Sequence, residues 1–144
     1  MRVSRVAFRY HLLVVCCTLL GCDAVGRGPE RASIHGIVTV DGVPVEEGML
    51  QFRPTQGNTG PVTGAVVTDG EYSTPKKKGP VLGLHQVEIR GSRKTGKMIE
   101  TRFGPAEERE PVVPERYAEE STLVRDVKAG DNEFNFELSS TPEG

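Results

Sequence analysis

The sequence predicts an all-β protein, a single antiparallel β-sandwich of seven short strands that follows an N-terminal signal peptide. Three observations lead to this prediction. Apolar and polar residues alternate with a period of two in several short segments, which is typical of half-buried strands. The 144 residues include 17 Gly and 10 Pro, so turns are frequent and long helices are scarce. No heptad, internal repeat or alternation of strands with helical segments is present.

The first 21 residues have the pattern of a signal peptide. Arg2, Arg5 and Arg9 precede an apolar run over residues 12–20, and no acidic residue occurs among them. The run is about half as long as the roughly 20 residues that a membrane-spanning helix needs. We therefore expect an export signal rather than a stable membrane span.

The tetrapeptide Leu19-Leu20-Gly21-Cys22 ends this run and resembles the lipobox of bacterial lipoproteins. The resemblance implies cleavage between Gly21 and Cys22 and attachment of lipid, including a fatty acid such as palmitate, to the Cys22 thiol. The alternative is an ordinary secretory signal followed by an incidental Cys. The predicted location is the cell envelope, with the lipid in either the inner or the outer bacterial membrane.

Cysteine content and charge agree with an exported domain. All three cysteines, Cys16, Cys17 and Cys22, lie at or before the predicted cleavage point, which leaves no internal disulfide and no Cys metal site. The formal net charge of −2 becomes −5 for residues 22–144, because the signal peptide removes three Arg. An acidic domain has no general attraction for phosphate backbones, so we expect no nucleic-acid partner.

The first strands follow a short polar segment. Residues 22–32 contain Gly, Pro and charge without periodicity and predict a lipidated Cys with a flexible tether. Residues 33–40 alternate strictly and predict the first strand of a domain that extends to residue 138. Asp41-Gly42 predicts a turn, and the strand pattern continues over residues 43–45 and 48–52.

The middle of the sequence predicts a hairpin and one further strand. After a polar loop over residues 55–61, residues 62–68 and 71–74 flank an Asp69-Gly70 turn. Residues 83–89 alternate again, with His85 on the apolar face.

The last third begins with a segment that lacks alternation. Residues 92–120 contain three Pro and mixed charges, and we expect a long mobile connection. Residues 122–127 and 133–138 predict the final two strands, joined by a turn at 129–132. Residues 139–144 are polar and predict a disordered tail.

The alternation also predicts which side chains form the core. The inward-facing residues are expected to be Leu50, Phe52, Tyr72, His85, Val87, Ile89, Phe134, Phe136 and Leu138.

Several short motifs together resemble one family over about residues 33–138. The first group is Ile34, Gly36, Val38, Val40, Asp41, Gly42, Pro44 and Val45, followed by Thr68, Asp69, Gly70 and Tyr72. The second group is Gly83, His85, Val87, Ile89, Pro114, Tyr117, Ser121, Thr122, Leu123, Val127, Gly130 and Asn132. In order and spacing these residues resemble the carboxypeptidase regulatory-like domain of small bacterial lipoproteins.

That resemblance implies a transthyretin-like (prealbumin-like) sandwich with an accessory role and no protease chemistry. Two features depart from the family pattern. Arg125 stands where an inward apolar residue is usual, and residues 92–111 are polar and irregular.

Residues that could hold a metal or perform catalysis lack the spacing that such chemistry needs. His35 and His85 fall on opposite faces, and no HxH or HxxxH pair supplies converging zinc ligands. Asp41, Asp69 and Asp131 occupy predicted turns rather than a calcium loop. No GxSxG elbow marks a nucleophile, so we expect no metal, no cofactor and no enzyme activity.

The weak candidates for ligand binding are aromatic and basic. Phe103 and Tyr117 are the aromatic residues outside both the signal peptide and the predicted core, and either could stack on a glycan. Lys76, Lys77 and Lys78 could contact anionic glycan or phospholipid headgroups. For each, a solvated or packed residue without a ligand is the alternative.

These observations favour a lipid-anchored, non-catalytic envelope protein that acts as a binding or scaffold module, on fold-level analogy. Its partners would be the membrane, through the N-terminal lipid, and an envelope protein or glycan. A glycan or peptide binder with a defined pocket is one alternative, in which Phe103, Tyr117 or the three lysines would converge on a concave surface. A small hydrolase, with Ser, His and Asp in hydrogen-bond reach, is the other.

Overall fold

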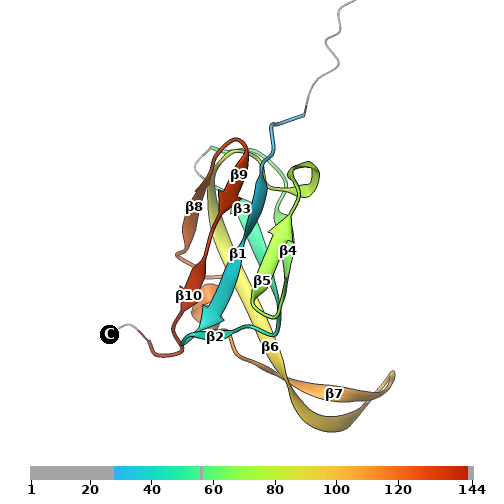
Figure 1. Ribbon diagram of the computed structural model, residues 1–144. Coiled ribbons are helices and arrows are strands. Elements are labelled where there is room, and N and C mark those ends of the chain that lie inside the picture. The colour runs from blue at the N-terminus through green and yellow to red at the C-terminus, as the bar shows by residue number, and fades with distance from the viewer. Residues whose placement is uncertain (1–27, 56, 143–144) are drawn as a thin grey trace, which may run out of the picture.

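A computed structural model describes residues 28–55 and 57–142 of the chain (Figure 1). The predicted signal peptide, with Gly21 and Cys22, lies outside the described residues. Within them the only helices are two short 3-10 turns, η2 (Lys76–Lys78) and η3 (Glu115–Tyr117). None of the helices in this part of the chain has the length and hydropathy of a membrane span.

The described chain is all-β, as the alternation predicts, with ten strands where seven were expected. The strands are β1 (Ser33–Val40), β2 (Val43–Pro44), β3 (Glu47–Pro54), β4 (Thr63–Thr68), β5 (Glu71–Thr74), β6 (Gly83–Thr101), β7 (Gly104–Pro111), β8 (Val124–Val127), β9 (Asp131–Glu133) and β10 (Phe136–Leu138). The three additional strands are β2, which is separate from β3, β7, which lies in the expected connection, and β9, which lies mostly in the expected turn at 129–132.

The strands form one hydrogen-bonded path in the order β10-β1-β5-β4-β3-β6-β7. β2 also pairs with β1, and β8 pairs with β6. Most pairs are antiparallel, but β9 and β10 run parallel to β1, which differs from the wholly antiparallel prediction. The difference arises because the chain leaves β8, which pairs with β6, and crosses to β1. β9 then runs in the same direction as β1.

The two Asp-Gly turns have the predicted geometry. Asp41 and Gly42 have φ of 50° and 80°, and Asp69 and Gly70 have φ of 50° and 83°. Positive φ at both central residues is what a tight hairpin turn requires, and Asp and Gly tolerate it better than other residues. These turns connect β1 to β2 and β4 to β5.

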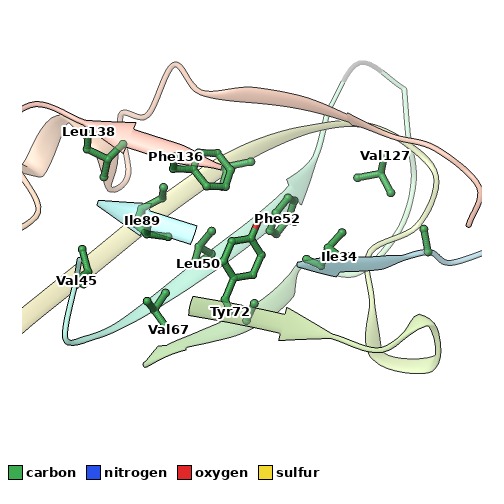
Figure 2. Packing of buried hydrophobic residues seen from close by; sticks show 14 residues of the cluster. Ile34, Val45, Leu50, Phe52, Val67, Tyr72, Ile89, Val127, Phe136 and Leu138 are labelled. Atoms are coloured by element: carbon green, nitrogen blue, oxygen red, sulfur yellow. The ribbon is translucent and has the colours of Figure 1, made fainter. Parts of the chain in front are cut away.

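One apolar core lies between the strands (Figure 2). Side chains from β1, β3, β6 and β10 converge in it, and Ile34, Leu50, Phe52, Ile89 and Phe136 are at most 1% exposed. The predicted inward set is buried except for Phe134, which is half-buried. The alternation therefore identified the core faces of these strands correctly.

The interruption between β9 and β10 is linked to the close approach of the two segments. The Phe134 carbonyl oxygen lies so near Gly36 that a Cβ at that position would overlap it. The same carbonyl accepts a hydrogen bond of 2.7 Å from the buried Tyr72 hydroxyl, whose pKa is raised by burial. The Asn135 side chain accepts a further bond from the Ile37 amide, 3.0 Å long.

Arg125, the residue expected to disturb the penultimate strand, is accommodated by an aromatic ring. Its guanidinium carbon lies 4.8 Å from the centre of the Phe136 ring, and one nitrogen donates to the Val124 carbonyl at 2.9 Å. A cation over a ring face is attracted by the ring quadrupole, so a charged residue can cover this part of the core.

The segment expected to be a mobile connection is largely a hairpin. β6 is 19 residues long and continues past the body of the domain, where it pairs with β7 (Figure 1). We call residues 92–111, which form this projection, the arm. Its sequence carries no alternation because neither face covers a core, so the pattern that identified the other strands is absent here. Residues 112–123 remain a connection, with η3 within it.

Both ends of the described chain are more ordered than the sequence predicts. Ala32 is fully buried, and the Leu82 amide donates to the Glu30 carbonyl at 3.1 Å, so the folded domain starts before residue 33. In the expected tail, the Ser140 amide donates to the Asp41 carboxylate at 3.0 Å and Arg116 donates to the Ser139 carbonyl. These polar contacts explain why hydrophobic patterning missed both segments.

Candidate functional site

The three consecutive lysines form an exposed basic turn, η2, which we call the lysine turn. Pro75 precedes it and Gly79 follows it, and none of its residues is buried. Lys76 Nζ lies 3.4 Å from Glu30 Oε1, and both side chains are more than half exposed. An ion pair that exposed is weak, so the lysine charges stay available to an external ligand.

The position of the lysine turn is set by the first described residues of the chain. Residues 30–32 run antiparallel beside residues 79–82, with an isolated bridge between Arg31 and Val81. The Arg31 guanidinium donates to the Gly79 carbonyl at 2.6 Å, directly after the lysine turn. Arg31 is therefore a fourth cation beside the three lysines. The sequence pattern does not predict that residues 31 and 79 lie together.

The tip of the arm is its most exposed apolar surface. Phe103 is 86% exposed, and Met98 and Ile99 are 66% and 42% exposed. The Arg102 guanidinium lies 4.7 Å from the centre of the Phe103 ring. The sequence predicts Phe103 as a candidate but gives no signal for Met98 and Ile99, because no alternation marks the hairpin that places them beside the tip.

The charged residues of the arm, except Glu100 and Arg102 near its tip, form ion pairs. Arg93 pairs with Glu110, Lys97 lies 3.8 Å from Glu108, and Arg109 pairs with Glu47 of β3. The pair between Arg109 and Glu47 joins the arm to the body, whereas the other two pairs link the two strands of the arm.

Tyr117, the other aromatic candidate, packs on the body of the domain. It contacts the core from η3, its hydroxyl accepts a bond from the Ser139 amide at 3.2 Å, and the Arg116 guanidinium lies 4.7 Å from the centre of its ring. These contacts attach the C-terminal segment to the connection before β8.

The two histidines have different surroundings, as their faces predict. The His35 side chain is 43% exposed, and its Nδ1 lies 3.3 Å from the Asp131 carboxylate. His85 is fully buried, with Nδ1 2.9 Å from the Gly83 carbonyl and no partner for Nε2 within the described part of the chain. Burial lowers the pKa of His85, since it penalises the charged form. No group of three His, Cys, Asp or Glu among the described residues could hold a metal ion.

Two of the three singled-out aspartates make contacts that favour their charged forms. Hydrogen bonds from Ser140 lower the pKa of Asp41, and the Ser33 hydroxyl, which donates to Asp131 at 2.7 Å, lowers the pKa of that residue. Both carboxylates therefore bind local donors within turns or strand ends, as the turn prediction implies.

Glu88 carries a buried carboxylate that the sequence pattern does not predict. Glu88 is 4% exposed although its neighbours in β6 face the core, and its carboxylate lies 2.9 Å from Arg53 Nε and 4.0 Å from Arg90. Arg90 also binds Glu119, 3.1 Å away. The network links β3, β6 and the connection before β8. A lone Glu within an alternating strand gave no signal for it.

The candidate ligand-binding residues lie in separate parts of the molecule. Phe103 is at the tip of the arm, Tyr117 is in η3, and the lysine turn follows β5 at the end of the domain opposite the arm (Figure 1). A shallow hollow at the base of the arm is lined by Asp41, Val43, Arg93 and Glu110 among others. Within the described residues, the aromatic and basic candidates therefore do not converge on one pocket.

Comparison with known proteins gives a distant likeness to a solved structure. No family model matches the chain, and no curated protein matches it. A solved structure of a DUF3823 family protein from Parabacteroides merdae is similar to it, with 15% sequence identity and a TM-score of 0.41. The match covers 76% of this chain and 46% of that protein, so the chain spans less than half of its length.

Proposed function

We propose that this protein is a lipid-anchored, non-catalytic module of the bacterial cell envelope with a transthyretin-like sandwich of the carboxypeptidase regulatory-like kind. One observation carries the proposal. The apolar run that ends at Gly21-Cys22 lies only eight residues before Glu30, where the backbone contacts of the β domain begin. A membrane-targeting sequence this close to a folded domain suits attachment through a lipid at Cys22.

The β architecture and the motif order support the finer part of this proposal. The two Asp-Gly turns and the strand faces agree with the family pattern, while the parallel pairing of β9 and β10 with β1 defines how the C-terminal part closes the core. In this proposal the arm is the binding element, because it projects an apolar tip with Phe103 at its end. Its occupant would be an envelope protein or glycan.

Metabolic labelling with a palmitate analogue, followed by fractionation, tests the anchor. We expect the wild type to take up label and to partition into detergent, whereas Cys22→Ser should take up none. Two saturated acyl chains hold a protein stably at a membrane, and one holds it only reversibly.

Cys17→Ser is the matched control, since it removes a neighbouring thiol of the same segment and should keep full labelling. An unlabelled wild type, or equal labelling of Cys22→Ser, would refute the lipid anchor.

A further inference from the structure

The lysine turn contacts a residue that follows the predicted anchor closely in the sequence. Lys76 contacts Glu30, which follows Cys22 by eight residues. Eight residues span at most about 28 Å even when fully extended. Glu30 therefore lies within that distance of Cys22, and the lysine turn and Arg31 lie beside Glu30.

The loops around the lysine turn are positively charged although the mature chain is acidic. They comprise residues 28–32, 57–62, 75–82 and 128–131, and the last of these lies here because the Ser33 amide donates to the Gly130 carbonyl at 3.1 Å. Together they carry five Lys or Arg and two Asp or Glu, a net charge of +3. The rest of the mature chain must then supply the negative charge.

The acidic residues gather at the other end of β1. Residues 41–47 and 69–71 lie there, joined by the bond from the Asp69 amide to the Glu46 carbonyl, and they contain five Asp or Glu and no Lys or Arg. One of the five, Glu47, is paired with Lys94 and Arg109 of the arm, and the other four make no ion pair with a described Lys or Arg. β1 has eight residues and separates the two ends by about 23 Å. The loops at the two ends of β1 therefore differ in charge, and the basic end is the one beside Glu30, which follows Cys22 by eight residues in the sequence.

We propose that the lysine turn, with Arg31 beside it, binds the anionic headgroups of phospholipids and holds the lipid-anchored domain upright, with its arm directed away from the bilayer. This inference rests on the proposed lipid anchor and adds the orientation of the domain. The lipid attaches the chain, and the lysine turn selects which end faces the membrane.

The exposure and pairing of the lysines suit this role. Lys77 and Lys78 make no ion pair with any described residue, and the pair between Lys76 and Glu30 is exposed. Each Lys near an anionic surface contributes about 1 kcal/mol. Three lysines thus favour the docked orientation over the undocked one by about a hundredfold, and this attraction weakens with salt.

Energy transfer from the arm to the bilayer tests the orientation in the full lipidated protein. The anchored chain is reconstituted in vesicles of phosphatidylcholine with or without phosphatidylglycerol, with acceptor dye on the lipid. A donor dye is attached at Phe103→Cys, which is the free thiol of the mature chain, since Cys22 carries lipid in this proposal and the other two cysteines precede it. We expect low transfer in phosphatidylglycerol vesicles and higher transfer in phosphatidylcholine alone, where the domain is free to tilt.

Two charge variants decide the role of the lysine turn. The variant Lys76→Gln, Lys77→Gln, Lys78→Gln should show the higher transfer in both kinds of vesicle. The control Arg93→Gln, Lys97→Gln, Arg102→Gln removes the same charge from the arm, keeps the pairs of Lys94 and Arg109 with Glu47, and should behave as the wild type.

Equal transfer for the lysine-turn variant and the wild type in phosphatidylglycerol vesicles would overturn the orientation and leave the anchor intact. A wild-type chain that fails to float with either kind of vesicle would instead refute the anchor, and the orientation with it. All six substituted side chains are exposed, and equal thermal unfolding of the variants and the wild type would confirm that folding is unaffected.

Discussion

Several individual residues of this domain provide partners for polar or charged groups at the edge of the small core. The Tyr72 hydroxyl and Asn135 satisfy backbone groups where β9 gives way to β10, and Arg125 places its charge over the Phe136 ring. His85 is the exception among the described residues, because its Nε2 is buried without a partner. An unpaired buried nitrogen costs free energy, and here it also ties stability to pH.

We predict that the domain loses stability as pH falls below about 6.5, the ordinary pKa of His85. Burial lowers the folded-state pKa, so between the two values the unfolded chain binds a proton that the folded chain refuses. Stability from this residue is therefore complete above pH 6.5 and declines by up to about 1.4 kcal/mol per pH unit, until the folded-state pKa is reached.

Urea denaturation of the wild type and of His85→Asn across pH 5 to 8 measures the free energy of unfolding at each pH. Below pH 6.5 we expect the wild type to lose up to about 1.4 kcal/mol per pH unit relative to the variant. The variant cannot titrate at this position, and its side chain can still donate to the Gly83 carbonyl. Parallel pH profiles for the two proteins would contradict the assignment. Asp41 and Asp131 have lowered pKa values, so their contributions to the stability of the domain change only at more acidic pH.

Gly36→Ala should lower the free energy of unfolding by about 1 to 3 kcal/mol, because the added methyl group overlaps the Phe134 carbonyl and the backbone must shift. Gly64→Ala is the control, since the nearest atom to its added Cβ is the Leu50 carbonyl oxygen at 3.8 Å. Equal effects of the two substitutions in chemical denaturation would show that the contact with Phe134 is not tight.

Phe136→Ala should cost about 3 to 5 kcal/mol, the usual range for a fully buried ring. Phe136 is 1% exposed, lies 6.3 Å from the Tyr72 ring centre and supports the Arg125 guanidinium. Thermal denaturation measures the loss. An effect below about 1 kcal/mol would show that the core collapses around the missing ring.

At the scale of the elements, the sequence predicted the strands that cover a core and missed those that do not. β1 and β5 have their predicted bounds, and β4 differs by one residue, because buried and more exposed residues largely alternate along each of them and apolar side chains supply most of the buried positions. The arm could not be found this way, since solvent lies on both of its faces. The lysine turn was visible as a motif, but its contact with Glu30 depends on long-range pairing.

Shortening the arm should leave the domain stable. Replacing residues 98–107 by Asn-Gly removes the apolar tip and keeps the pairs between the base of the arm and Glu47. We expect a change within about 0.5 kcal/mol, since the deleted residues are almost all exposed. Thermal unfolding checks this expectation, and a large loss of stability would mean that the arm supports the core.

A photo-crosslinking residue at Phe103 should capture an envelope component in intact cells if the arm is the binding element. The same residue at Val66, which is 65% exposed on β4, provides the matched control. Equal products from both positions would indicate non-specific contact and would remove the arm from the proposed function.

At the scale of the whole molecule, we propose a lipid at one end of the domain and the arm at the other. In the proposed arrangement, Cys22 would attach the chain, the lysine turn would face the headgroups, and the acidic end of β1 and the arm would point away from the bilayer. Folding does not depend on the lipid in this account, because the described core and its hydrogen bonds lie within residues 30–141. The anchor is the claim on which the rest depends.

Mass spectrometry of the N-terminal peptide, from protein purified out of the bacterial envelope, tests that claim most directly. The account predicts a mature chain that begins at Cys22, with the mass of a diacylglyceryl group and of any amide-linked fatty acid on that residue. A chain that begins at another residue, or that begins at Cys22 with an unmodified thiol, would contradict it.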